Sequence, residues 1–312
     1  MSLRDSFDLN GIAEITIRHN SDNITRTVAY QNFYFKHPEI RWALLASMVS
    51  RNAGWNMTDL SLLPFQKILT KKVRQRLFMT YERANWLIFS DAYPQLLMYE
   101  LSKENNQPLF HLLRKYHVSY FMIREWQRFW ETKDVNRLTQ ALIINEQNVI
   151  ENPVIRQHFF SEQVFKSIPY LLETILKLNA VIFPTVEGEL YGIEIHRFTH
   201  LDERIAVGHT LTDILFNPEL FQKFINFILM VPPTGSREEY ENFLTINGQQ
   251  ALPLRSIFPK VDHQDIIRQD WLKFRGCKQK WWLVKYERDT RKDISHYYVK
   301  KRLIDIIGNR KK

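Results

Sequence analysis

Six polar or charged side chains within apolar, helix-forming stretches are the first candidates for chemistry in this sequence. They are Arg51, Asp59, Glu82, Asn85, Asn145 and Glu146. Drawn as a helix, residues 40–53 are apolar nearly all round, and Arg51 falls between Ile40 and Leu44. We therefore expect its guanidinium to be buried. A buried guanidinium needs a carboxylate or several carbonyl acceptors, because leaving it unpaired costs several kcal/mol.

Partners for Arg51 are expected on two other helices. Glu82 shares a helical face with Trp86, and Asn145 lies within an apolar stripe that has Glu146 at its edge. Two interpretations remain open: a structural ion-pair network that sets how the helices pack, or the polar site of a hydrolase-like enzyme. Because no catalytic spacing motif accompanies these residues, the structural interpretation is favoured.

The polar stretch that follows Arg51 has a simple local explanation. In "SRNAGWNMTDL", residues 50–60, Gly54 suits the left-handed position just after a helix. Asn56, Thr58 and Asp59 are common capping and turn residues. The pattern therefore predicts that the helix starting near residue 38 ends at Gly54.

A possible metal site lies in "HRFTHLDERIAVGH". His196, His200 and Glu203 are residue types that bind Zn²⁺ or Fe, but their spacing does not match the H-E-x-x-H signature. Ordinary capping and surface residues are therefore the favoured interpretation. The phosphate-loop, dinucleotide-binding and G-x-S-x-G patterns are also missing from the sequence. No cofactor is identified.

Composition and patterning predict a mainly α, multi-helix globular protein with a small β-hairpin insertion and a basic C-terminal segment. Glycine, at 9 of 312 residues, is scarce, and apolar residues repeat at three- and four-residue spacing up to about residue 178. Two β-prone pieces around Glu187-Gly188 then predict the hairpin, within residues 179–195. We expect a helical part over 1–178, a hairpin with further helices over 179–250, and an aromatic-rich basic segment over 251–312.

Element boundaries are predicted from prolines, glycines and caps. Helices are expected over 23–36 and 38–53, then over about 65–90, with Pro94 opening a further helix to about residue 103. In the C-terminal segment we expect a helix over 262–274, a strand over 278–287 and a closing helix over 291–307.

All of the net positive charge lies in the last fifth of the chain. Residues 251–312 contain 17 lysines and arginines against 7 aspartates and glutamates, whereas residues 1–250 contain 26 against 27. Basic groups that alternate with aromatic rings suggest a nucleic-acid surface, and an anionic membrane would be attracted by the same charges. The alternative is that the aromatic rings form a core and the cations a solvated face. The candidate nucleic-acid-binding residues are Lys273, Arg275, Lys278, Lys280, Lys285, Lys300, Lys301 and Arg302.

The sequence favours a cytoplasmic protein. No run of 18 uncharged apolar residues is present, and the N-terminus lacks the apolar region of a secretory signal. The single cysteine, Cys277, excludes an intramolecular disulfide and suits a reducing compartment.

Several phrases resemble a known family. "NITRTVAYQNFY", "HPEIRWALLASMVSRNAGWNMTDL", "ERANWLIFSDAYPQLLMYE" and "ALIINEQNVI" are similar to the YppC-like family of uncharacterised bacillar proteins, a domain of unknown function. The resemblance implies a bacterial, cytosolic, mainly helical protein and assigns no activity. Three hypotheses follow: binding of nucleic acid or another anionic partner through the C-terminal segment, an enzyme with a polar site among the N-terminal helices, or a structural or interaction protein without catalysis.

Overall fold

Helices and one small sheet make up the fold. The computed structural model describes residues 3–156, 180–195, 200–244, 252–264 and 268–283 of the chain. Over these residues the protein is mainly α-helical with a single two-stranded antiparallel sheet, so the predicted fold class is confirmed.

The N-terminal half contains the long helices. Side-chain caps begin several of them: Asp22 and Thr25 form a capping box for α2, and Ser119 caps α6. The elements are α1 (Leu3–His19), α2 (Asn23–Lys36), α3 (Arg41–Asp59), α4 (Leu63–Ile68), α5 (Lys71–Glu104), the 3₁₀ helix η1 (Phe110–Tyr116), α6 (Tyr120–Thr132), α7 (Val135–Ile150) and the π-helix η2 (Glu151–Ile155).

Shorter elements make up the described ranges from residue 180 onward. They are β1 (Ala180–Pro184), β2 (Leu190–Glu194), α10 (Leu201–Leu215), α11 (Phe221–Met230), α12 (Glu238–Glu241), α13 (Leu254–Ile257), α14 (Trp271–Arg275) and the 3₁₀ helix η4 (Gln279–Trp282). The predicted hairpin is confirmed: β1 and β2 pair antiparallel, with Ala180 opposite Glu194 and Pro184 opposite Leu190.

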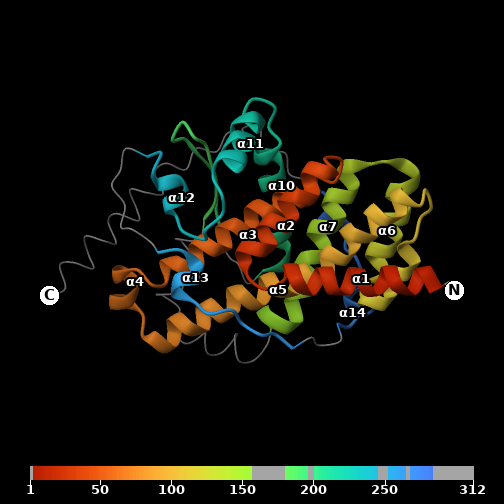
Figure 1. Ribbon diagram of the computed structural model, residues 1–312, viewed down its shortest axis with the longest axis horizontal. Coiled ribbons are helices and arrows are strands. Elements are labelled where there is room, and N and C mark those ends of the chain that lie inside the picture. The colour runs from red at the N-terminus through yellow and green to blue at the C-terminus, as the bar shows by residue number, and fades with distance from the viewer. Residues whose placement is uncertain (1–2, 157–179, 196–199, 245–251, 265–267, 284–312) are drawn as a thin grey trace.

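Helix α3 is the central element. It runs through the middle of the molecule, with α6 and α7 toward one end and α4 toward the other (Figure 1). It packs against α2, α5, α7, α10 and β1, and its side chains Trp42, Leu44 and Trp55 are completely buried. A helix that is apolar on every side must be surrounded by other elements, and α3 is.

The predicted end of this helix at Gly54 is wrong, because α3 continues to Asp59. Gly54 has a packing role instead. A Cβ atom at this position would lie 3.2 Å from the Cα of Gly235, so the missing side chain lets the loop between α11 and α12 approach the helix closely.

The predicted break before Pro94 is also wrong. Helix α5 is continuous and contains Pro94 in its interior. A proline cannot donate the usual backbone hydrogen bond to the carbonyl four residues earlier, here that of Ser90. This carbonyl instead accepts a hydrogen bond from Arg268 Nη2 at 3.2 Å. A tertiary contact from Arg268 thus supplies the hydrogen-bond donor that Pro94 lacks.

The C-terminal segment departs from its predicted elements where it is described. The helix expected over 262–274 is reduced to α14, residues 259–264 lack regular structure, and the expected strand begins with η4. The expected closing helix over 291–307 lies outside the described residues. Trp271 and Trp281 are buried in the largest hydrophobic cluster, together with side chains from α2, α3 and α10.

That cluster draws buried side chains from all three predicted parts of the chain, among them Leu44, Phe183 and Trp271. The division at residues 178 and 250 stays a prediction. Within the described ranges, no helix is long and apolar enough to cross a membrane.

Candidate functional site

The buried arginine of α3 pairs with a carboxylate from the short helix α12, which follows the loop between α11 and α12. Arg51 Nε lies 2.5 Å from Glu239 Oε2, and both side chains are only 1% exposed. Arg51 Nη2 also donates to the Val231 carbonyl at 2.7 Å. Burial lowers the pKa of Arg51, and the charge and hydrogen bond of Glu239 oppose that shift. The acids expected as partners from sequence, Glu82 and Glu146, contact other side chains instead.

The polar residues after Gly54 also hold this loop. Asp59 Oδ2 accepts from Arg237 Nε at 2.7 Å, and Asn56 Oδ1 accepts from Arg237 Nη2 at 2.8 Å. Thr58 Oγ1 donates to the Gly235 carbonyl at 2.9 Å. The stretch that resembled a helix stop is therefore the docking surface on α3 for the loop between α11 and α12.

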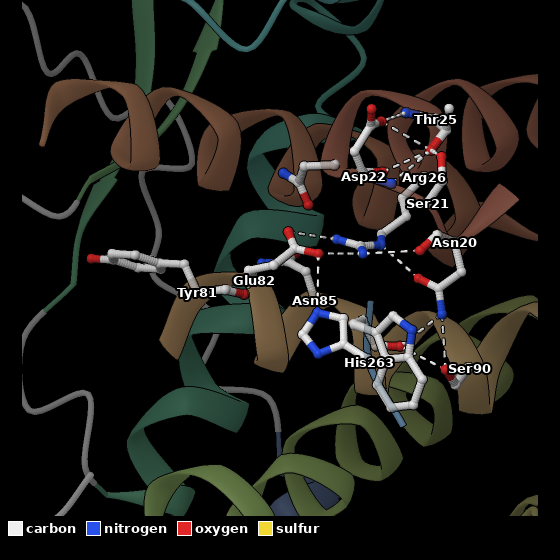
Figure 2. Close-up of polar contacts among 12 residues, drawn as sticks. Asn20, Ser21, Asp22, Thr25, Arg26, Tyr81, Glu82, Asn85, Ser90 and His263 are labelled. Carbon is white, nitrogen blue, oxygen red and sulfur yellow. Dashed lines mark hydrogen bonds and ion pairs between the residues drawn. The ribbon is translucent and has the colours of Figure 1, made fainter. Parts of the chain in front are cut away.

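Glu82 forms a second buried ion pair, with Arg26 of α2. The two guanidinium nitrogens donate to the two carboxylate oxygens at 2.9 and 2.5 Å, while Arg26 Nε donates to Asn20 Oδ1 (Figure 2). His263 Nε2 lies 3.3 Å from Glu82 Oε1, the oxygen that also accepts from Arg26 Nη2. Burial alone would raise the pKa of Glu82, but Arg26 and His263 together lower it. Nearby Asn85 donates to the Tyr81 carbonyl.

Asn145 belongs to a third cluster. Its Nδ2 donates to Asp91 Oδ2 at 2.6 Å, and its Oδ1 accepts from Ser119 Oγ at 2.8 Å and from Trp271 Nε1 at 2.9 Å. Asp91 Oδ1 lies 3.6 Å from Arg268 Nε. Burial raises the pKa of Asp91 despite this attraction and the bonds from Asn145 and Gln95.

Glu146 lies apart from these clusters. Its half-buried carboxyl group accepts from Trp42 Nε1 at 3.1 Å and from Gln147 Nε2 at 3.0 Å. Burial raises its pKa to about 7, and the two hydrogen bonds only partly oppose that shift.

The six predicted residues thus do not converge on one centre. Arg51 and Asp59 hold the loop between α11 and α12, Glu82 and Asn85 lie near the α2 ion pair, and Asn145 and Glu146 contact different partners. Within the described chain, Arg51, Asp59 and Glu82 are each held in a buried ion pair.

A cavity lies beside the Asn145 cluster. It has a volume of about 720 Å³, and Arg268 lies in its wall, so we call it the Arg268 cavity. Its polar lining includes Asp91, His117, Ser119, Asn148, His263 and Arg268. Its apolar lining includes Met79, Leu87, Val149, Val261 and Trp271. A neighbouring cavity of about 600 Å³, beside α1, shares His117, His263 and Arg268.

Two backbone carbonyls hold the Arg268 side chain. Its Nη2 donates to the Tyr116 carbonyl at 2.7 Å as well as to the Ser90 carbonyl. Arg268 and Asp91 were missed from sequence. The only signal was a single acid in the apolar run "LIFSDAY", three residues before Pro94.

The predicted metal-binding residues are not brought together where they are described. His200 precedes α10 and Glu203 lies in its first turn, both exposed, while His196 lies outside the described residues. Among the residues that the structure describes, no group of three or more His, Cys, Asp and Glu side chains could hold a metal ion.

The predicted nucleic-acid-binding residues are only partly described. Lys273, Lys278 and Lys280 are exposed, and Lys280 pairs with Asp202. The side chain of Arg275 and residues Lys285, Lys300, Lys301 and Arg302 lie outside what the structure describes.

The fold and the cavity define a mainly helical protein with a cavity against helices α5 and α7. The chain belongs to the family described as "Protein of unknown function (DUF2515)", whose model matches residues 18–303. Over 295 residues it is 46% identical to the uncharacterised protein YppC of Bacillus subtilis (strain 168). The aligned region covers 94% of this chain and 92% of that protein. The resemblance found from sequence is therefore confirmed. No solved structure matches the chain.

Proposed function

We propose that this protein binds a small organic molecule in the Arg268 cavity. The observation that carries the proposal is a volume of about 720 Å³ that combines apolar side chains with a few fixed polar groups. Sites for small molecules in proteins usually have volumes of roughly 300–1,000 Å³ and this mixture of lining groups.

The polar groups are held in place before any ligand arrives. Asp91 accepts from Asn145 and Gln95, and Asn145 also accepts from Ser119. Arg268 donates to two backbone carbonyls. Such preorganisation supports binding because less side-chain freedom is lost when the ligand is captured.

The contacts of Ser119 favour binding over hydrolysis. A nucleophilic serine needs a neighbouring base that takes its proton. Ser119 Oγ instead donates to Asn145 Oδ1, an amide oxygen that does not serve as a base at neutral pH. The enzyme hypothesis built on Arg51 and Asp59 places its site outside the lining of this cavity, and we propose that those residues hold the loop between α11 and α12.

The test is a fragment screen by saturation-transfer NMR on the full chain and on Val149→Trp, in which the larger side chain fills the cavity. A matched control is Val28→Trp, at a partly exposed position of α2 outside the cavity lining. We expect fragments to bind the unsubstituted protein and Val28→Trp but to lose binding to Val149→Trp. Equal binding to all three proteins, or no binding to any, would contradict the proposal.

As a second candidate function, we propose that the C-terminal segment associates with nucleic acid. The supporting observation is its charge: 17 basic against 7 acidic residues over 251–312. Trp271 and Trp281 are buried, so the proposed attraction rests on phosphate contacts rather than on base stacking by these two rings.

Fluorescence anisotropy with a labelled 20-base-pair DNA tests this second proposal. We expect binding at about 50 mM salt that weakens by roughly 10³-fold or more at about 200 mM, as for a protein with several phosphate contacts. Lys273→Ala with Lys278→Ala should reduce the salt dependence. Binding that is missing or insensitive to salt would rule out the proposal.

We also propose a cytoplasmic location for the protein. One cysteine cannot form an intramolecular disulfide, and such chains suit a reducing compartment. Fractionation of a bacterium that expresses the native chain should recover it with cytoplasmic markers, and recovery with secreted proteins would contradict this.

A further inference from the structure

One buried acceptor in the Arg268 cavity is left without a donor. Asn148 on α7 is 4% exposed, and its Nδ2 donates to the Ile144 carbonyl at 2.8 Å. That bond orients the amide, so the group that remains is the oxygen, Oδ1. Among the described residues no hydrogen-bond donor reaches this buried atom.

Such an atom is uncommon in folded proteins. Most buried polar side-chain atoms have at least one hydrogen-bond partner, since an unsatisfied one costs about 1–3 kcal/mol in lost solvation. Asn148 is also one of the residues that line the cavity. The neighbouring amide Asn145 lies one turn earlier on the same face, and both of its polar atoms are used within the protein.

The helix changes its geometry at Glu151, three residues after Asn148. Residues Glu151–Ile155 form a π-helix, in which the Arg156 N–H donates to the Glu151 carbonyl, five residues earlier, at 2.8 Å. Pro153 cannot make the α-helical bond to the Val149 carbonyl. Both Val149 and Pro153 line the cavity. Short π-helical turns are rare and occur frequently at functional sites.

The arginine and aspartate charges around the cavity are balanced. Besides His117 and His263, its described lining residues include two cations, Arg83 and Arg268, and two anions, Asp91 and Asp262. Arg83 also lies over the Trp86 ring, 4.5 Å from its centroid. A charged ligand would therefore meet no excess of opposite charge, whereas burying its own charge would cost free energy. An uncharged ligand avoids that cost.

We infer that the ligand of the Arg268 cavity is an uncharged molecule with an apolar, ring-sized body and an N–H or O–H group that donates to Asn148 Oδ1. This inference rests on the proposed function. The apolar body contacts side chains such as Leu87 and Val149, and the donor satisfies the remaining oxygen of the amide.

The experiment uses two pairs of neutral probes that differ in their donor: indole with 1-methylindole, and 2-naphthol with 2-methoxynaphthalene. Their dissociation constants are measured by saturation-transfer NMR titration on the unsubstituted protein, Asn148→Leu and Asn85→Leu. Asn85 is the matched control because its Nδ2 makes the same bond to a carbonyl four residues earlier, outside the cavity lining.

We expect each donor-bearing probe to bind the unsubstituted protein about 2- to 10-fold more tightly than its methylated partner, as for one hydrogen bond. Asn148→Leu should abolish this preference, and Asn85→Leu should keep it. The comparison on the unsubstituted protein needs no variant, so it stands even where Asn148→Leu does not fold.

The outcomes separate the two proposals. Equal binding of both members of a pair, weakened by Val149→Trp, would overturn the donor inference while supporting the cavity as a binding site. A preference that persists in Asn148→Leu would also overturn it. If none of the four probes binds at millimolar concentration, the inference and the proposed function both fail.

Discussion

The buried pair between Arg51 and Glu239 gives the sharpest test of how the loop between α11 and α12 is held. We consider Glu239→Gln, which keeps the shape of the side chain. Its Oε1 can still accept from the Thr234 and Gly235 N–H groups, as Glu239 Oε1 does at 2.6 and 2.7 Å. The new amide nitrogen, however, faces Arg51 Nε, so that two donors meet.

The magnitude follows from the burial of the guanidinium. Arg51 is 1% exposed as a side chain and stays protonated, so Glu239→Gln leaves a buried cation beside the Val231 carbonyl and the rings of Phe227 and Trp55, without a carboxylate. Removing one partner of a buried ion pair costs about 3–5 kcal/mol. Arg51→Met should cost less, about 1–3 kcal/mol, because the carboxylate keeps the N–H groups of the loop as donors.

Urea denaturation at 25 °C, followed by circular dichroism, measures the free energy of unfolding of each variant. The double variant Arg51→Met with Glu239→Gln should be at least about 1 kcal/mol more stable than the sum of the single effects indicates, because no cation is left without its carboxylate. The reasoning is refuted if Glu239→Gln lowers stability by less than about 1 kcal/mol, or if Arg51→Met is the more damaging change.

Three further predictions concern other parts of the fold. Gly192→Ala should lower the free energy of unfolding by about 2–5 kcal/mol, because φ is 147° and a Cβ would lie 2.0 Å from the Val181 carbonyl oxygen; wild-type stability in the same urea titration would contradict this. Ser119→Ala should cost about 1–2 kcal/mol through the loss of its bonds with Asn145 and the Met122 N–H, and a change below about 0.5 kcal/mol in thermal unfolding would argue against that role. The unfolded chain releases the Glu146 proton near pH 4.5 and the folded chain near the pKa of about 7, so raising the pH through this window should destabilise the wild type by about 1–3 kcal/mol relative to Glu146→Gln. A constant difference between pH 4.5 and pH 8 would show that burial does not raise this pKa.

The hairpin could be predicted from sequence because its signals are local. Two apolar β-prone pieces flank Glu187-Gly188, and Gly188 has the positive φ of 83° that a tight turn requires. Only residues close in sequence take part in that decision.

The continuation of α3 through Gly54 and of α5 through Pro94 could not be predicted, because distant contacts override the local preference. Gly54 remains helical where the loop containing Gly235 packs against it. Pro94 remains helical although the Ser90 carbonyl loses its usual donor, since Arg268 supplies another from 178 residues away in the chain.

In the candidate site, too, local sequence predicted some features and distant contacts decided the others. Asn145 was identified because a polar residue on an apolar stripe must find partners, yet the sequence could not show that these are Asp91, Ser119 and Trp271. The free oxygen of Asn148 is invisible in the sequence, because hydrogen-bond satisfaction is a property of three-dimensional neighbours.

By itself, the sequence determined a helical protein with one hairpin, its family, and a buried arginine at position 51 that needs an acid. Helical periodicity and the cost of burying a charge are enough for these conclusions. Only the tertiary structure decided that the acid is Glu239 and that a cavity opens beside Asp91 and Arg268. These outcomes depend on which distant segments meet, and no local pattern encodes that.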